Sequence, residues 1–235
     1  MESDMQTRVS ILRAEQPGSR ATLDREERLV KDGILRMGSL VEAQIRDAVR
    51  SVAQRDLEPA ARVVSSDDRI NDAPHAIAET IVSTIATQSP VARDLRFLIG
   101  LDHVAFELER IGDHASSIAK QVRFLAEEAP LPQTTALTQM GRQAADQVRG
   151  IVSALIDVDD KIAREVAGHD DEIDHLYRKT FADLIDLMRS DPRTVERGTR
   201  LILAAHWVER IGDRVTNIAE DVVYLATGKI EDLNP

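Results

Sequence analysis

The 235-residue chain contains no cysteine, and aromatic residues make up only 3% of it. Without cysteine the protein has neither disulfides nor thiolate metal ligands. A sandwich or barrel of strands would call for more tyrosine, phenylalanine and threonine, whereas the prevailing Ala, Leu, Ile, Val, Asp, Glu and Arg suit helix–helix packing. These absences favour an all-α protein.

Long apolar runs are also missing, and none approaches the roughly 18 residues of a membrane span. The chain does not open with the apolar stretch of a signal peptide. The formal net charge is −11, and such a field repels the phosphates of nucleic acids. We therefore expect a cytoplasmic protein that binds no nucleic acid and meets a membrane only through partners.

Prolines and a glycine divide the chain into six helical segments. In the third and sixth segments, apolar residues recur at alternating spacings of three and four, which is typical of packing against near-antiparallel neighbours. The pattern predicts two tandem antiparallel three-helix bundles. We assign residues 1–20 to a mobile N-terminal extension, 21–129 to the first bundle and 133–228 to the second. The helices are expected at about residues 22–54, 60–88, 91–128, 134–157, 159–190 and 194–227.

One pentapeptide occurs twice. Residues 109–113 read Glu-Arg-Ile-Gly-Asp, and residues 209–213 read the same five letters. The offset of 100 residues also matches flanking apolar positions, such as Ile118 with Ile218. A repeat at one fixed offset indicates that the chain consists of two copies of one helical unit.

The repeated motif places two carboxylates four residues apart, which is one turn of a helix. By the 3.6-residue geometry of the helix, Glu109 and Asp113 point away from the apolar seam, and so do Glu209 and Asp213. Other segments carry further donors at similar spacings. The remaining candidate metal ligands are His206, Asn217 and Glu220 on the sixth segment, Asp67 and Asn71 on the second, and Asp170 and Asp174 on the fifth.

If these segments are neighbours in space, each bundle brings four oxygen-bearing side chains together. Such ligands suit hard or borderline cations, namely Fe, Mn, Mg, Ca and Zn. An outward-facing site suits docking or storage better than catalysis, because nothing excludes water from it. Two plainer interpretations stand beside this one: the acids are solvated surface, and the repeated glycines, Gly112 and Gly212, serve only tight helix packing.

Several motifs together identify a family. They are both copies of the pentapeptide, residues 37–42 in the first segment, Pro90 with residues 94–96 at the start of the third, residues 170–177 in the fifth, and residues 217–220 in the sixth. Over about residues 22–228, the chain resembles the PhoU-type regulators of bacterial phosphate uptake.

The resemblance implies two bundles related by a pseudo-twofold axis, with multinuclear clusters of iron or zinc on their surface. It implies a non-enzymatic adaptor that forms a homodimer. This adaptor links the ATPase subunit of a Pst-type phosphate transporter to a PhoR-type sensor histidine kinase. Such an adaptor damps the phosphate-starvation response. The implied metal ligands are Asp67 with Asn71 and Glu109 with Asp113 in the first half, and Asp170 with Asp174 and Glu209 with Asp213 in the second.

The first half departs from the family pattern. Pro74 stands where relatives often carry an acid, and a proline inside a helix removes a hydrogen bond and kinks it. Lys120 stands where the second half has Glu220, and its charge would repel a cation. We therefore expect the second site to be the stronger one. Two other classes of function are kept as alternatives: a metal-dependent enzyme with surface carboxylate sites, and a metal-free helical scaffold.

Overall fold

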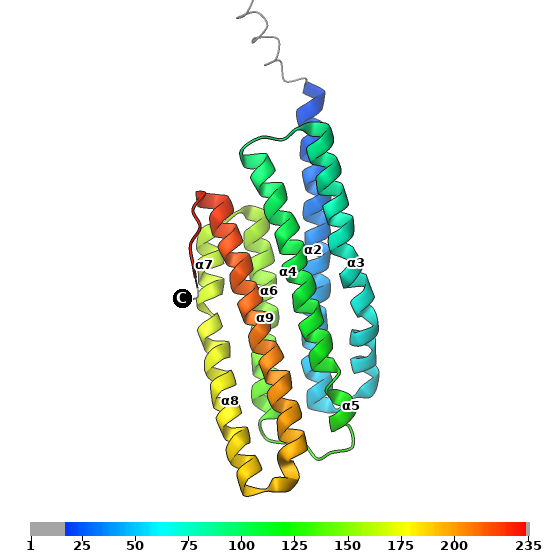
Figure 1. The fold of residues 1–235 in the computed structure, drawn as a ribbon, viewed down its shortest axis with the longest axis vertical. Helices are drawn as coiled ribbons and strands as arrows, with labels where there is room; N and C mark the ends of the chain where they lie inside the picture. The colour runs from blue at the N-terminus through cyan, green and yellow to red at the C-terminus, as the bar shows by residue number, and fades with distance from the viewer. Residues whose placement is uncertain (1–16, 234–235) are drawn as a thin grey trace, which may run out of the picture.

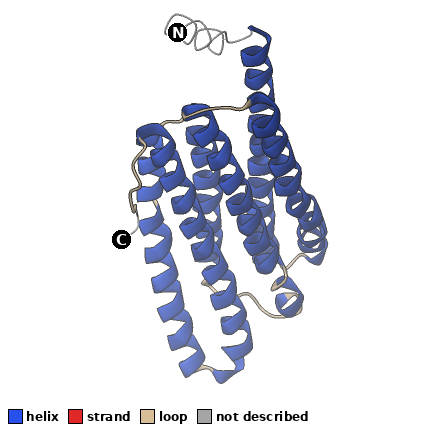
Figure 2. Ribbon diagram, turned by 45° about the horizontal axis from the view of Figure 1, so that its top comes forward, coloured by secondary structure: helices blue, strands red, loops and turns tan. Residues whose placement is uncertain are grey.

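The computed structural model of the chain describes residues 17–233, except for the side chains of residues 17–19 and 67–69. Long helices run side by side along the molecule (Figure 1), and Figure 2 shows only helices and loops in the described part of the chain. The predicted all-α fold of two antiparallel three-helix bundles is confirmed. The elements are α2 (Pro17–Gln54), α3 (Leu57–Gln88), α4 (Arg93–Ala119), α5 (Val122–Leu125), α6 (Thr134–Asp157), α7 (Asp160–Gly168), α8 (Asp170–Ser190), a 3-10 turn (Pro192–Thr194) and α9 (Val195–Thr227).

Local signals explain where several helices begin and end. Asp56 before α3 and Asp159 before α7 accept backbone N–H groups of the following turn through their side chains, which is the role of an N-cap. At the end of α9, Gly228 has a left-handed φ of 74°, and its N–H group donates to the carbonyl of Tyr224. A glycine in this conformation is the common C-terminal cap of a helix.

Two predicted helix starts were wrong. α2 begins at Pro17, because proline is tolerated in the first turn of a helix, where its missing N–H group would have no partner. Residues 17–20 are therefore helical and not part of an extension, while the rest of that prediction, residues 1–16, lies outside the described residues. α3 begins at Leu57 and continues as one helix through the buried Pro74.

Two other predicted helices are interrupted. The third ends at Ala119, and α5 follows after a turn in which the N–H of Gln121 donates to the carbonyl of Ile118. The fifth is divided at His169 into α7 and α8. Gly168 has a low helix propensity, and three acidic residues begin α8, where negative charge is favoured by the helix dipole.

The two halves contact each other through equivalent positions of the sequence repeat. A Cβ on Gly38 of α2 would lie 2.8 Å from Val152 of α6, and one on Gly141 of α6 would lie 2.5 Å from Val49 of α2. An offset of 103 residues exchanges the two pairs. Glycine at both positions lets α2 and α6 approach closely, and the arrangement is pseudo-twofold.

The same symmetry relates α4 to α9. Arg214 of α9 donates to Glu107 of α4 at 3.5 Å. An offset of 100 residues relates position 214 to 114 and position 107 to 207. At these equivalent positions His114 of α4 stacks on Trp207 of α9, with 5.2 Å between ring centroids. The pseudo-twofold axis therefore passes between these two helices.

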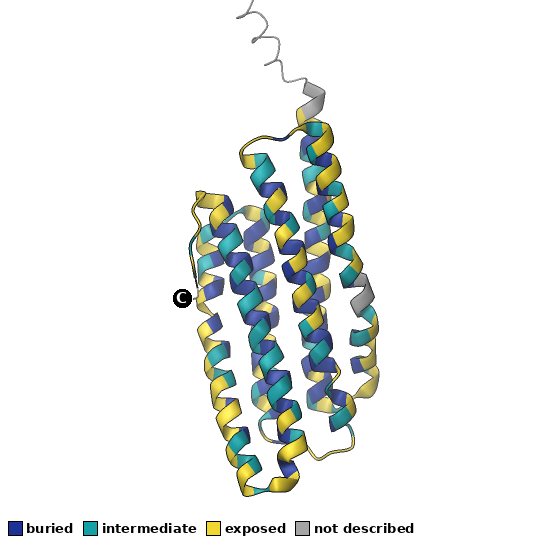
Figure 3. Ribbon diagram, viewed as in Figure 1, coloured by how far each residue is buried: buried dark blue, intermediate teal, exposed yellow. Residues whose placement is uncertain are grey.

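The halves share one continuous hydrophobic core, drawn from all the long helices. In Figure 3 the buried faces turn toward the centre of the molecule and the exposed faces toward its outside. Among residues 17–233, every helix is too short or too polar to cross a bilayer.

Candidate metal centre

Asp170, the first residue of α8, is only 6% exposed. A side chain on Gly212 of α9 would overlap its carboxylate, so the glycine is what allows α8 to place an acid against the α9 backbone. The Oδ1 atom of Asp170 is enclosed without a hydrogen-bond partner. A buried carboxylate oxygen without a donor is costly, and it is the kind of group that a cation satisfies.

Three further carboxylates surround Asp170: Asp174 in α8, and Glu209 and Asp213 in α9. Burial, together with the negative charges of these neighbours, raises the pKa of Asp170 to about 7. Burial also raises the pKa of Glu209 and of Asp213, and Asp174 adds to both effects. Asp170, Asp174, Glu209 and Asp213, which the sequence proposed for the second half, thus lie close enough for their charges to interact.

Three of these acids contact a cationic or imidazole side chain one turn away on their own helix. The contacts are Arg210 with Asp213 at 2.6 Å, Arg178 with Asp174 at 3.3 Å, and Nδ1 of His206 with Oε2 of Glu209 at 3.3 Å. In the described part of the chain, no three His, Asp or Glu side chains already stand where one ion would bind them. Partly exposed ion pairs of this kind contribute about 0–1 kcal/mol.

The prediction that the repeated acids face outward was wrong for three of four. Asp113 is exposed, whereas Glu109, Glu209 and Asp213 are half-buried. The angle around a single helix places these residues away from the seam of that helix. It does not reveal that a neighbouring helix of the same bundle covers them.

The outer candidates on α9 have other partners. The Nδ2 group of Asn217 donates to Glu107 of α4 at 3.4 Å. The Oε1 atom of Glu220 accepts the backbone N–H of Leu233 at 3.0 Å. The predicted stripe on the sixth helix therefore divides, and Glu209 and Asp213 are its members that join Asp170.

The first half provides a different arrangement. Asn71 is half-buried and its Oδ1 atom has no hydrogen-bond partner, while the side chain of Asp67 lies outside the described residues. A Cβ on Gly112 would lie 3.0 Å from Ile70. Tight helix packing, the plainer interpretation, therefore accounts for Gly112.

The burial of Asp170 had a signal in the sequence that was missed. Asp170, Ile173, Tyr177, Thr180 and Leu184 are spaced alternately by three and four residues. This is the spacing of an apolar seam, and four of the five residues are buried while Tyr177 is half-buried. The position of Asp170 on this spacing predicts that its side chain is buried.

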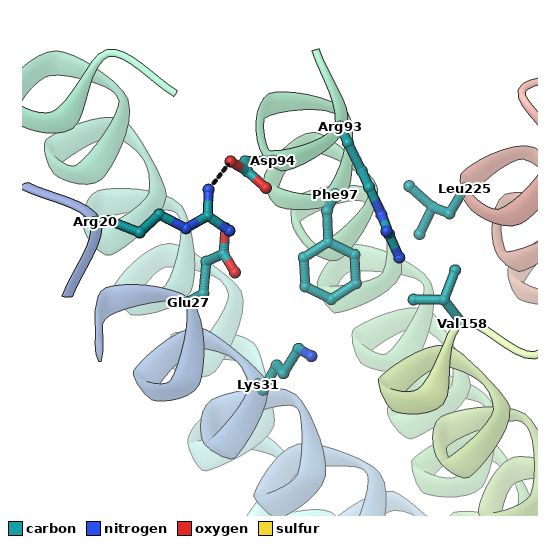
Figure 4. A pocket seen from close by; sticks show the side chains of 8 residues that line it. All are labelled: Arg20, Glu27, Lys31, Arg93, Asp94, Phe97, Val158 and Leu225. Atoms are coloured by element: carbon teal, nitrogen blue, oxygen red, sulfur yellow. Dashed lines mark hydrogen bonds and ion pairs between the residues drawn. The ribbon is translucent and has the colours of Figure 1, made fainter. Parts of the chain in front are cut away.

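A second polar site lies where α2, α4 and the α6–α7 connection meet (Figure 4). The cleft has a volume of about 280 Å³. Arg20 donates to Asp94 at 2.5 Å, and Arg93 extends toward Val158 and Leu225. Asp94 belongs to the motif at the start of the third helix, so one role of that motif is to tie α4 to α2.

Comparison with known proteins decides the family. The PhoU domain matches residues 34–122 and 137–222 of the chain. The chain belongs to the PhoU family. The "Phosphate-specific transport system accessory protein PhoU homolog" of Clostridium acetobutylicum is 35% identical to this family member, over 86% of the chain and 92% of the relative. The homolog of the same description from Pseudomonas aeruginosa is 36% identical, over 85% of the chain and 83% of the relative.

Solved PhoU structures share the fold. The crystal structure of PhoU from Pseudomonas aeruginosa matches with a TM-score of 0.84 at 36% identity, covering 88% of this chain and 99% of that one. The crystal structure of the phosphate transport system regulatory protein PhoU from Streptococcus pneumoniae also has a TM-score of 0.84, at 30% identity, covering 89% of this chain and 99% of that one.

Proposed function

We propose that this PhoU family member is a non-enzymatic, metal-binding adaptor that negatively regulates phosphate uptake and the phosphate-starvation response in the cytoplasm. Its relatives are accessory and regulatory proteins of phosphate transport systems, which supports a role as regulator. The observation that carries the metal-binding part is the gathering of three carboxylates from α8 and α9 around the buried carboxylate of Asp170.

The residues fit a cation. Asp170, Asp174, Glu209 and Asp213 would hold it, and their oxygen ligands suit iron or zinc, with Mn, Mg and Ca as alternatives. The ion would reduce the repulsion among the four acids. Because two of these acids lie on α8 and two on α9, the ion would bind between these helices.

The proposed partners follow from family membership. They are the ATPase subunit of a Pst-type phosphate transporter and a PhoR-type sensor histidine kinase, with a homodimer as the working assembly. The purified, metal-loaded protein should bind at least one of these partners at micromolar concentration. Failure to bind either would reject the adaptor role, whatever the metal content.

The metal-binding part is tested by elemental analysis of protein purified without a histidine tag. We expect stoichiometric Fe, Zn or Mn, reduced in Glu209→Ala/Asp213→Ala and less reduced in Glu109→Ala/Asp113→Ala. The matched control is Asp183→Ala/Asp186→Ala, which removes two exposed acids from α8 and should leave the metal in place.

Two results would overturn the metal-binding part. One is protein that stays metal-free under several metal supplies, which would leave a bare helical scaffold. The other is equal metal loss in the control variant, which would mean that general surface charge, and not the acids around Asp170, attracts the ions.

A further inference from the structure

The chain turns back along α9 after that helix ends. Following Gly228, residues 229–233 run down beside α7, as the red segment at the left of Figure 1 shows. This segment and α9 together line a cavity of about 510 Å³. We call residues 229–233 the return segment, and the surfaces of α7 and α9 that face it the return groove.

Contacts of Glu231 and Leu233 help to hold the return segment. The Glu231 carboxylate accepts a hydrogen bond from Arg164 of α7 at 2.8 Å. The backbone N–H of Leu233 donates to Glu220 of α9 at 3.0 Å, and the Leu233 side chain packs, partly buried, against the core. Ile230, by contrast, is 90% exposed. The segment is therefore recognised through one acid, one backbone amide and one aliphatic side chain.

Arginines border the return groove. Arg164 lies on α7, and Arg210 and Arg214 of α9 line the same cavity as Glu231 and Asp232 of the segment. Guanidinium groups are good ligands for carboxylates because they offer several donors in one plane. Of the three, Arg164 is the arginine bonded to the segment, whereas Arg210 pairs with Asp213 and Arg214 with Glu107.

The acidic side chains of the groove have partners of their own, which limits their repulsion of an acidic segment. Arg210 holds Asp213 at 2.6 Å, and Glu220 is the acceptor for the backbone of the segment. Asp160 lies 3.6 Å from Arg164, farther than the 2.8 Å of Glu231. The carboxylate of the return segment is therefore the closer partner of Arg164.

We infer that the return groove is a docking surface for an acidic segment of a partner protein, with an aliphatic residue two positions after an acidic one. The return segment of the chain itself is the intramolecular competitor for this surface. A partner must displace it to dock, so the segment sets the concentration of partner that docking requires.

The size of this competition depends on the fraction of molecules in which the return segment fills the groove. A short tether gives its segment an effective concentration on the order of 1 mM. If the return segment fills the groove in about nine molecules of ten, the same peptide in free form binds the open groove with a Kd of about 0.1 mM. The wild-type chain should then bind that peptide roughly tenfold more weakly than an opened chain does.

The test measures fluorescence anisotropy of a labelled peptide with the sequence Lys-Ile-Glu-Asp-Leu-Asn-Pro, titrated with full-length protein. The opened chain is the variant Glu231→Lys/Leu233→Lys, which removes two contacts of the segment and leaves the groove intact. EDTA is present throughout, so the result is independent of the metal binding proposed above.

We expect the opened chain to bind the peptide about tenfold more tightly than the wild type does. Adding Arg164→Glu to the opened chain should abolish binding. Adding Arg189→Glu, which reverses another arginine in an ion pair near the far end of α8, should not change it. A peptide with lysine at both acidic positions should not bind.

Four results would overturn the inference. The first three are equal affinity of the wild-type and opened chains, no peptide binding by the opened chain at about 1 mM protein, and binding that survives Arg164→Glu. Binding seen only when EDTA is replaced by a metal ion would also overturn it, because the ion and not the arginines would then recognise the acids.

Discussion

Replacing Asp170 with asparagine should stabilise the metal-free protein, and increasingly so as the pH rises. Asparagine has nearly the shape of aspartate, so the space beside Gly212 is kept, while the ionisable group is lost. The pKa of Asp170 is raised from 3.8 to about 7, at about 1.4 kcal/mol for each tenfold change in proton affinity. Ionised Asp170 therefore costs the folded protein about 4 kcal/mol above pH 7.

The pH window follows from the direction of the change. A carboxyl group whose pKa is higher in the folded state adds stability below its unfolded pKa, near 4, and this stability is lost as the pH rises through the folded pKa, near 7. Between pH 5 and pH 8 the wild type should lose about 2–3 kcal/mol that Asp170→Asn keeps. The other acids titrate in both proteins, so most of their contribution cancels in the comparison.

The measurement is urea denaturation of both proteins in EDTA at pH 5 and pH 8. The reasoning is refuted if the difference in unfolding free energy does not change with pH, or if the variant is the less stable protein at pH 8. Adding the metal ion found by elemental analysis should make the wild type the more stable protein at pH 8. The ion would stabilise the ionised carboxylate of Asp170, and the variant lacks this ligand.

Two other predictions concern the contacts between the halves. Gly141→Ala places a Cβ 2.5 Å from Val49 and should destabilise the protein by about 1–3 kcal/mol through overpacking. The control Gly168→Ala, whose Cβ meets nothing within 4 Å, should be neutral or slightly stabilising. Equal denaturation midpoints for the two variants would contradict the close approach of α2 and α6. Burial and then the positive charge of Arg214 lower the pKa of His114 to about 4, so an NMR titration should find its imidazole neutral at pH 5.5, and a titration near pH 6.5 would mean that the stack on Trp207 is open.

The sequence alone was enough for the all-α fold, the duplication and five of the six main helix ends. These features depend on local patterns: the three-and-four spacing of apolar residues, the prolines and Gly228. It also placed the acids of the second half on two helices at spacings that let them meet. Local patterns of this kind report which residues share a face of one helix, because a helix has a fixed geometry.

The neighbours of each face were decided by the tertiary structure. The burial of Asp170, the close approach of Gly141 to Val49 and the seat of the return segment all join residues that are distant in sequence. Their energies depend on which helices pack together, and no spacing within one helix contains that information.

The repeated pentapeptide shows this division most directly. Five identical residues form one helical turn and place Gly112 and Gly212 at the same position in each half. In the first half the glycine packs against Ile70, and in the second it makes room for the carboxylate of Asp170. The sequence determined the turn and its glycine, and the packing of α3 and α8 determined whether an aliphatic side chain or an acid lies against it.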